Sequence, residues 1–155
     1  MPFYERKSPR MPKYDYSNSN YYFITLCTHG HRCIFGKPGK LNQFGIIVQR
    51  DLLWIQKYYP GVKIDKYVVM PNHVHAIIVL ENGFTNPSIS KIVALYKTGV
   101  TKQLRKIKPD IQVWQRSFYD HIIRSQKSYE EIWTYIDNNP LKWEMDKLYR
   151  NHDEP

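Results

Sequence analysis

Two histidines separated by one residue are the part of this sequence with the clearest capacity for chemistry. His73 and His75 lie in the stretch 67–80, whose β-branched and apolar flanks predict two short strands that meet near Pro71. Side chains two residues apart on a strand point to the same face, so both imidazoles should project together. Two neutral imidazoles side by side can chelate a divalent metal ion, although a lone pair of this kind also occurs as buried, hydrogen-bonded histidines.

A tyrosine and an asparagine are expected to face these histidines from a helix near the end of the chain. Tyr135 and Asn139 are four residues apart and share one side of that helix with two isoleucines. This side is otherwise apolar and should pack on the protein, which turns the phenol and the carboxamide inward. A metal would then take two imidazole nitrogens and the amide oxygen of Asn139. The Tyr135 phenol, with an ordinary pKa of about 10, would be a nucleophile activated by a metal on the scissile phosphate.

The elements that must position these groups follow the order βαββαβα. Apolar residues at steps of three and four predict the helices, and β-branched or aromatic runs predict the strands. Ser128 and Glu131 have the spacing of a capping box at the start of the last helix, and Pro140 ends it. The expected strands are 21–28, 62–70, 73–80 and 113–123, and the expected helices are 41–59, 88–108 and 128–139.

The first six elements predict an α+β fold with the ferredoxin-like βαββαβ arrangement. Its antiparallel sheet would be covered on one face by two helices. The other face would be free for a substrate and for the C-terminal helix that carries the tyrosine.

The charge of the chain indicates a polyanionic partner. The 155 residues suit one domain and carry a net charge of +9. Nucleic acid is the commonest such partner, although a protein kept soluble by its charge would look the same. The helix 88–108 has six Lys or Arg and no acid, which favours a phosphate-binding face over a merely solvated one. The candidate DNA-binding residues are Arg10, Lys13, Lys91, Lys97, Lys102, Arg105, Arg116 and Arg124.

We expect a basic N-terminal arm at 1–20, a domain at 21–143 and a C-terminal tail at 144–155. The arm contains three prolines and four basic residues, and it would either lie on nucleic acid or form a tail without a core. The N-terminus has no signal-peptide pattern and no apolar run approaches membrane-spanning length. Two cysteines do not make a disulfide framework, so a cytoplasmic protein without a membrane partner is expected.

The segment from Cys27 to Cys33 resembles a zinc site only superficially. Its spacing matches none of the common zinc modules. We therefore expect a turn in which His29 and His31 are exposed.

Three motifs resemble the REP-associated tyrosine transposases, which belong to the single-strand insertion-sequence transposases of the HUH class. The motifs are Met-Pro-Asn-His-Val-His at 70–75, Trp-Gln-Arg-Ser-Phe-Tyr-Asp-His-Ile-Ile-Arg at 114–124 and Tyr-Ile-Asp-Asn-Asn-Pro at 135–140, and the resemblance extends over about residues 10–143. It implies a ferredoxin-like fold and metal-dependent cleavage of single-stranded DNA, often at a hairpin. It also implies a covalent 5′-phosphotyrosyl intermediate with a free 3′-hydroxyl, and rejoining by reversal.

By position, the resemblance implies His73 and His75 as metal ligands and Tyr135 as the nucleophile. Asn139 lies where relatives carry an amide, often Gln, that completes the metal site. Magnesium or manganese is the implied ion, whereas imidazole ligands alone would also suit zinc. Relatives occur both as monomers and as homodimers, so the resemblance leaves the oligomeric state open.

Two other classes of function remain open at this point. One is a non-catalytic protein that recognises hairpin DNA with the same fold. The other is a zinc-dependent hydrolase, which would need a carboxylate base that the histidine motif does not supply. Asp120 and His121 would contact DNA, support the site or make structural hydrogen bonds, and Tyr129 should point away from the site.

Overall fold

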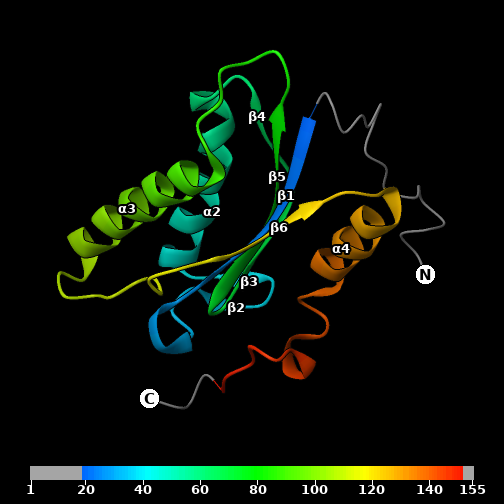
Figure 1. The fold of residues 1–155 in the computed structure, drawn as a ribbon. Helices are drawn as coiled ribbons and strands as arrows, with labels where there is room; N and C mark the ends of the chain where they lie inside the picture. Colours follow the sequence, from blue (N-terminus) through cyan, green and yellow to red (C-terminus); the bar gives the residue numbers. More distant parts are fainter. Residues whose placement is uncertain (1–18, 152–155) are drawn as a thin grey trace.

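The computed structural model describes residues 19–151, and its centre is a four-stranded antiparallel sheet (Figure 1). The strands are β1 (Ser19–Cys27), β4 (Val62–Met70), β5 (His73–Glu81) and β6 (Tyr119–Ile123), in the spatial order β4-β5-β1-β6. Because β5 pairs with both β1 and β4, the two strands joined by the first crossover do not touch. This split βαβ pattern is the predicted ferredoxin-like α+β fold.

The helices lie on both faces of the sheet. Helices α2 (Gln43–Tyr58) and α3 (Ile89–Ile107) cover one face, and α4 (Gln126–Asn138) lies against the other (Figure 1). A short hairpin, β2 (Gly36–Lys37) and β3 (Lys40–Leu41), and the turns η1 (His29–His31) and η2 (Trp143–Met145) complete the structure. The expected turn is thus present at His29–His31, where His29 is exposed and His31 is partly buried.

Side chains of strand β5 are buried on both faces of the sheet, which explains why its sequence is almost continuously apolar. Val74, Ala76 and Ile78 belong to the large core beneath α2 and α3. Ile77 and Val79 belong to a smaller core beneath α4, which Tyr129 and Ile136 complete. The two histidines share the face of Ile77 and Val79, as the alternation predicts.

The helix starts are fixed by side-chain caps. Asn42 accepts a hydrogen bond from the Gly45 N–H at 2.9 Å, and Ser88 accepts one from the Lys91 N–H at 3.1 Å. The predicted capping box at Ser128 is wrong. Ser125 is the cap of α4, because its extended backbone brings its hydroxyl to 3.1 Å from the Ser128 N–H.

The predicted fourth strand is correct only for its last five residues, which form β6. Upstream, Ile111 and Val113 are buried in the large core, and the pairing with the end of β1 is reduced to an isolated antiparallel bridge between Thr28 and Trp114. The Lys97 ammonium donates to the backbone carbonyls of Gln115 at 2.8 Å and Ser117 at 3.3 Å. These contacts hold the segment as a loop. Within residues 19–151, no helix combines the length and the apolar character needed to cross a membrane.

Candidate metal and nucleophile site

The two histidines lie side by side on β5 and are buried. Their ring centroids are 4.6 Å apart, and the residues are 0% and 3% exposed. His73 pairs in register with Cys27 of β1 and His75 with Thr25, so both imidazoles project from the interior of the sheet.

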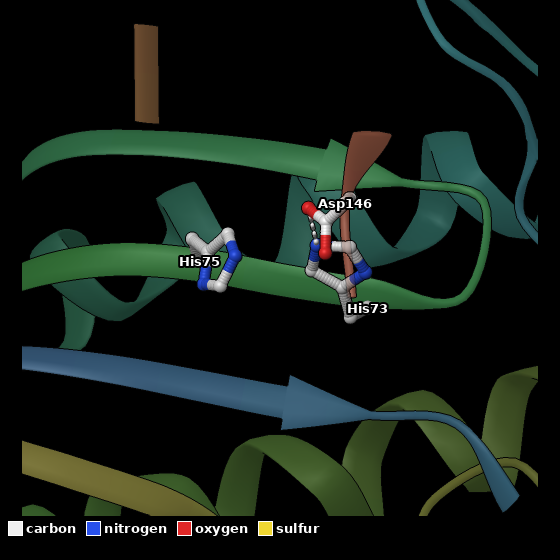
Figure 2. A group of neighbouring side chains, drawn as sticks. All are labelled: His73, His75 and Asp146. Atoms are coloured by element: carbon white, nitrogen blue, oxygen red, sulfur yellow. Dashed lines mark ion pairs between the residues drawn. The ribbon is translucent and has the colours of Figure 1, made fainter. Parts of the chain in front are cut away.

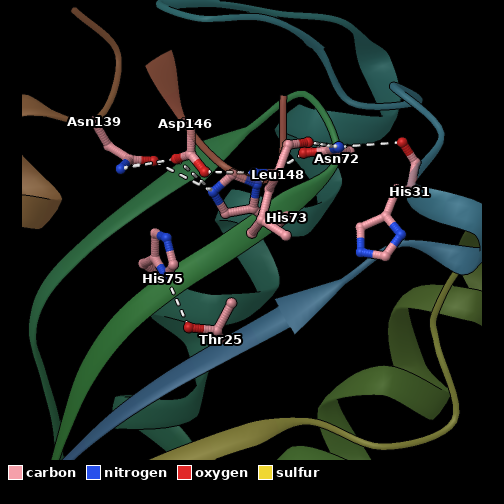
Figure 3. Close-up of polar contacts among 8 residues, drawn as sticks. All are labelled: Thr25, His31, Asn72, His73, His75, Asn139, Asp146 and Leu148. Carbon is pink, nitrogen blue, oxygen red and sulfur yellow. Dashed lines mark hydrogen bonds and ion pairs between the residues drawn. The ribbon is translucent and has the colours of Figure 1, made fainter. Parts of the chain in front are cut away.

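Each imidazole is held through its Nδ1 atom. His73 Nδ1 lies 2.8 Å from the Asn72 Oδ1 atom, and His75 Nδ1 lies 2.9 Å from the Thr25 hydroxyl (Figure 3). The amide oxygen of Asn72 can only accept, so His73 carries its proton on Nδ1 and presents a lone pair at Nε2. The Thr25 hydroxyl can accept in the same way and leave Nε2 of His75 bare. Such contacts orient metal-binding histidines in proteins.

Asp146 is the third group of the cluster, and it comes from the segment that follows α4. Its carboxylate is 3% exposed, and one oxygen lies 3.9 Å from His73 Nε2. One ligand atom from each of His73, His75 and Asp146 lies within 4.8 Å of the others (Figure 2). The segment is fastened by Asn72, whose amide nitrogen donates to the Leu148 carbonyl at 2.7 Å.

Asn139 completes the cluster as the C-terminal cap of α4. Its Oδ1 atom lies 3.3 Å from His73 Nε2, and its amide nitrogen donates to the Asp146 carboxylate at 3.3 Å. The residue is 3% exposed. Three lone-pair atoms therefore converge: an imidazole nitrogen, an amide oxygen and a carboxylate oxygen.

The cluster fits a divalent cation. Among the described residues, His75 Nε2 is buried and has no hydrogen-bond partner. A buried polar atom without a partner is costly, and so are facing lone pairs, whereas a cation between them would satisfy all of these groups. Two imidazoles with oxygen ligands suit manganese or zinc, and the oxygen ligands also suit magnesium.

The protonation states agree with ligand function. Burial lowers the pKa of His73 to about 4, although the Asp146 carboxylate and the Asn139 amide partly oppose this shift. Burial and the neighbouring His73 lower the pKa of His75 well below its usual value. Both imidazoles are therefore neutral near pH 7, which is the form that binds metals.

Tyr135 lies beside this cluster. Its ring centroid is 5.2 Å from that of His75 and 6.4 Å from that of Phe23, and the residue is 42% exposed. The structure thus brings Tyr135 and Asn139 to the histidines, as the helical spacing predicted. Burial raises the pKa of the Tyr135 phenol and Asp146 raises it further, whereas Asn139 lowers it.

The helix that carries Tyr135 is fastened to β4 by two polar contacts. The Lys66 ammonium lies 2.8 Å from an Asp137 carboxylate oxygen. The Tyr129 hydroxyl donates to Asp65, and burial together with this carboxylate raises the pKa of Tyr129. Tyr129 is 2% exposed and belongs to the core, so it points away from the cluster as expected.

The candidate DNA-binding residues do not form one surface with this cluster. Those on α3 lie on the opposite face of the sheet. Two of them serve the fold, since Lys97 binds loop carbonyls and Arg105 Nε donates to the Ile111 carbonyl at 3.1 Å. Lys91 and Lys102 are exposed.

The remaining candidates lie elsewhere. Arg116 and Arg124 are exposed. Arg124 lines a shallow cavity of about 520 Å³ at the β6 edge together with Asp120 and His121. Arg10 and Lys13 lie outside the described residues.

Sequence reasoning missed three members of the cluster. Asn72 and Thr25 orient the histidines, and Asn72 could have been suspected because it directly precedes His73. Asp146 has no spacing relationship to the other residues, and it lies in the segment expected to be a tail. Asp146 also supplies the carboxylate that a zinc-dependent hydrolase would need and that the histidine motif lacks. The geometry therefore fits both a hydrolase and a transposase, and family membership decides between them.

The profile of the IS200-like transposase family matches residues 18–139 of the chain. A Haemophilus influenzae protein named as a REP-associated tyrosine transposase is 32% identical over 138 residues, which cover 83% of this chain and 74% of that protein. The chain belongs to the REP-associated tyrosine transposases of the IS200-like family. An uncharacterised protein of the same organism is 38% identical over 169 residues and covers 94% of both chains.

Solved transposase structures share the fold of this family member. A REP-associated tyrosine transposase bound to a REP hairpin superposes with a TM-score of 0.61 at 24% identity, covering 79% of this chain and 67% of that one. A structure named as a transposase from Deinococcus radiodurans gives a TM-score of 0.56 at 17% identity, covering 84% of this chain and 96% of that one. Because the chain belongs to this family, the transposase class of function is better supported than the zinc-dependent hydrolase class.

Proposed function

We propose that this transposase cleaves and rejoins single-stranded DNA at hairpins, with Tyr135 as the nucleophile and a divalent metal site next to it. His73, His75 and Asp146 would hold the ion, and Asn139 would add its amide oxygen. Magnesium or manganese is the expected ion, and the target would be single-stranded or hairpin DNA.

The observation that carries this proposal is the convergence of unshared lone pairs beside Tyr135. His73 Nε2 faces Asn139 Oδ1 at 3.3 Å and an Asp146 oxygen at 3.9 Å. All of these side chains are nearly inaccessible to water. A cluster that only stabilised the fold would pair every acceptor with a donor. Here His73 Nε2 faces the Asn139 oxygen with no donor between them, and the buried His75 Nε2 has no hydrogen-bond partner among the described residues.

A bound divalent ion would supply positive charge to the scissile phosphate and to the developing phenolate. That charge matters here because burial and Asp146 both raise the pKa of Tyr135. Asn139 favours the ionised phenol and so partly offsets them.

The chemical step is a transesterification. The Tyr135 oxygen, having lost its proton, forms a bond to phosphorus, and the bond from phosphorus to the 3′-oxygen breaks. The leaving 3′-oxygen takes up a proton, and the 5′-phosphate stays on Tyr135. Rejoining is the reverse attack by a 3′-hydroxyl, so no cofactor is consumed and no phosphodiester energy is lost.

The approach of the DNA is supported by aromatic rings that lead from Tyr135 through the partly buried Phe23 to the exposed Tyr119. Phe23 contacts both Tyr135 and Tyr119, with ring centroids 6.4 Å and 6.2 Å away. Tyr119 is 57% exposed on the edge strand β6. Aromatic side chains of this kind stack with unpaired bases, and Arg124 is exposed just past the other end of β6, where it can bind a phosphate further along the strand.

The products of a labelled hairpin oligonucleotide test the proposal. Incubation with Mn²⁺ or Mg²⁺ should give a free 3′-hydroxyl on one fragment and protein on the 5′ end of the other. His75→Ala should form neither product, while His29→Ala, altered in the exposed turn, should match the wild type. Hairpin binding without cleavage under any metal would instead support a non-catalytic DNA-binding protein.

A further inference from the structure

The face of the sheet opposite Tyr135 carries a groove that the proposed chemistry does not use. It lies between α2 and α3 and encloses about 630 Å³, a volume typical of small-ligand sites. Both helices line it, with polar and aromatic side chains that include Arg50, Asp51, Trp54, Tyr58 and Gln103.

One wall of the groove is a pair of exposed aromatic rings. Trp54 and Tyr58 are one turn apart on α2, with ring centroids 6.2 Å apart, and they are 47% and 74% exposed. Leu95 of α3 is 52% exposed on the opposite wall. Large apolar side chains gathered at one exposed place usually mark a binding surface.

One end of the groove is polar and offers both donors and acceptors. Arg50 donates to Gln103 and to Asp51, and the Gln103 amide donates to Asp51. A guanidinium, a carboxamide and a carboxylate are the groups that proteins use to recognise the edges of bases.

The surroundings of the groove are basic. The Lys57 ammonium lies 5.2 Å from the Trp54 ring centroid. Lys102 is exposed next to Gln103, and α3 contains no acidic residue. Single-stranded nucleic acid is bound by aromatic rings that stack with its bases together with cations that bind its phosphates.

We propose that this groove binds unpaired bases of a DNA strand, with Trp54 and Tyr58 as stacking platforms and the cluster of Arg50, Asp51 and Gln103 reading a base edge. The identity of the ligand rests on the proposed function. A second copy of the chain is a poorer occupant, because it would bring another net charge of +9 towards this basic face.

The position of the groove has a consequence for substrate length. Helices α2 and α3, which line the groove, cover one face of the sheet, and α4, which carries Tyr135, lies against the other face (Figure 1). One strand therefore contacts both only by passing round a sheet edge. Short strands should therefore be cleaved without using the groove, and longer strands should gain affinity from it.

Two double variants separate stacking from simple apolar burial. Trp54→Leu with Tyr58→Leu keeps apolar side chains but removes the rings, whereas Trp54→Phe with Tyr58→Phe keeps rings. Thermal melting establishes that each variant is folded. Affinity is then measured by fluorescence anisotropy with a labelled oligothymidylate of roughly 30 nucleotides, long enough to span several stacking sites, at one salt concentration.

We expect the leucine variant to bind about fivefold or more weakly, and the phenylalanine variant to stay within about twofold of the wild type. A strand carrying 5-iodouracil should crosslink to the peptide with Trp54 and Tyr58. Equal affinity of all three proteins, or crosslinks confined to other peptides, would overturn the proposal. Loss of self-association without loss of DNA affinity in the leucine variant would make the groove an interface between copies and would also overturn it.

Adduct formation at Tyr135 on a short hairpin substrate is measured in parallel. If the leucine variant forms the adduct and also binds the long strand as tightly as the wild type, the groove is not a DNA site, whereas the proposed function stands. Crosslinking to the groove without any adduct would reject the cleavage function and leave the groove standing as a DNA site.

Discussion

Asn139 Oδ1 lies 3.3 Å from His73 Nε2, and because His73 Nδ1 donates to Asn72, the Nε2 atom is an acceptor that faces this amide oxygen. The Asp146 carboxylate oxygen 3.9 Å from the same nitrogen adds a negative charge and accepts from the Asn139 amide nitrogen. Acceptors without a shared proton repel one another, and burial prevents water from separating them. A cation at this point would turn the repulsion into attraction, which is the physical basis of the proposed metal site.

Divalent metal should therefore stabilise the folded protein. At a concentration about one hundred times the dissociation constant, binding to the folded state alone contributes about 2.7 kcal/mol. Thermal melting with and without Mn²⁺ measures the effect. His75→Gln should abolish the shift and His29→Gln should preserve it. An identical shift in the His75 variant would show that the ion binds elsewhere.

Asn72 should control metal affinity without being a ligand. It fixes the His73 tautomer through Oδ1 and holds the segment of Asp146 through its bond to the Leu148 carbonyl. Asn72→Ala should weaken Mn²⁺ binding about 10- to 100-fold, as measured by isothermal titration calorimetry. Asn72→Asp should lose less, because a carboxylate still accepts from His73 Nδ1. Unchanged affinity in the alanine variant would contradict this role.

The stability of the metal-free protein should fall as the pH drops from about 6.5 towards 4. The unfolded chain protonates its histidines near 6.5, whereas burial holds the pKa of His73 to about 4 and that of His75 well below its usual value. The unfolded state therefore binds more protons in this window, and each such histidine removes roughly 1.4 kcal/mol per pH unit.

Asp65 acts in the opposite direction. Burial raises its pKa, so the folded protein takes up this proton before the unfolded chain does, and stability is gained as the pH falls through that pKa. Urea unfolding at pH 7, 6 and 5 in an Asp65→Asn background isolates the histidine effect. A flat dependence over these three values would mean that the two imidazoles are charged or solvated.

The basic residues of α3 should contribute to DNA binding through Lys91 and Lys102 rather than Lys97. Each phosphate contact adds about 0.7 to the slope of log affinity against log salt for single strands. Lys91→Glu with Lys102→Glu should flatten that slope by more than one. Lys97→Glu should mainly lower the melting temperature, since Lys97 holds loop carbonyls. A slope that is the same as in the wild type would remove this helix from the DNA-binding surface.

Much of the fold was predictable because its signals are local. The apolar run after His73 marks a strand buried on both faces, and the four-residue step from Tyr135 to Asn139 marks one side of a helix. Both patterns depend only on the repeat of the backbone. The resemblance to the transposases then supplied the roles that spacing alone left open.

The remaining features depend on tertiary contacts. Asp146 reaches His73 only because the chain turns back after Pro140 and is tied to Asn72. Val113 is a β-branched residue of the kind common in strands, but its side chain is buried in the core beneath α2 and α3. Lys97 has the sequence context of a surface cation, yet its ammonium meets carbonyls that only the folded chain brings to it.

The central claim is that Tyr135 attacks the phosphate. Tyr135→Phe removes one oxygen and keeps the ring contacts with His75 and Phe23, so DNA affinity and melting temperature should stay close to those of the wild type. Tyr129→Phe is the matched control, because its hydroxyl is committed to Asp65 and lies in the core.

The most direct measurement is mass spectrometry of the covalent adduct formed with a labelled hairpin oligonucleotide and Mn²⁺. The label should survive denaturation, map to the peptide that contains Tyr135, persist in Tyr129→Phe and vanish in Tyr135→Phe. An adduct on any other residue, or undiminished cleavage by Tyr135→Phe, would contradict the account.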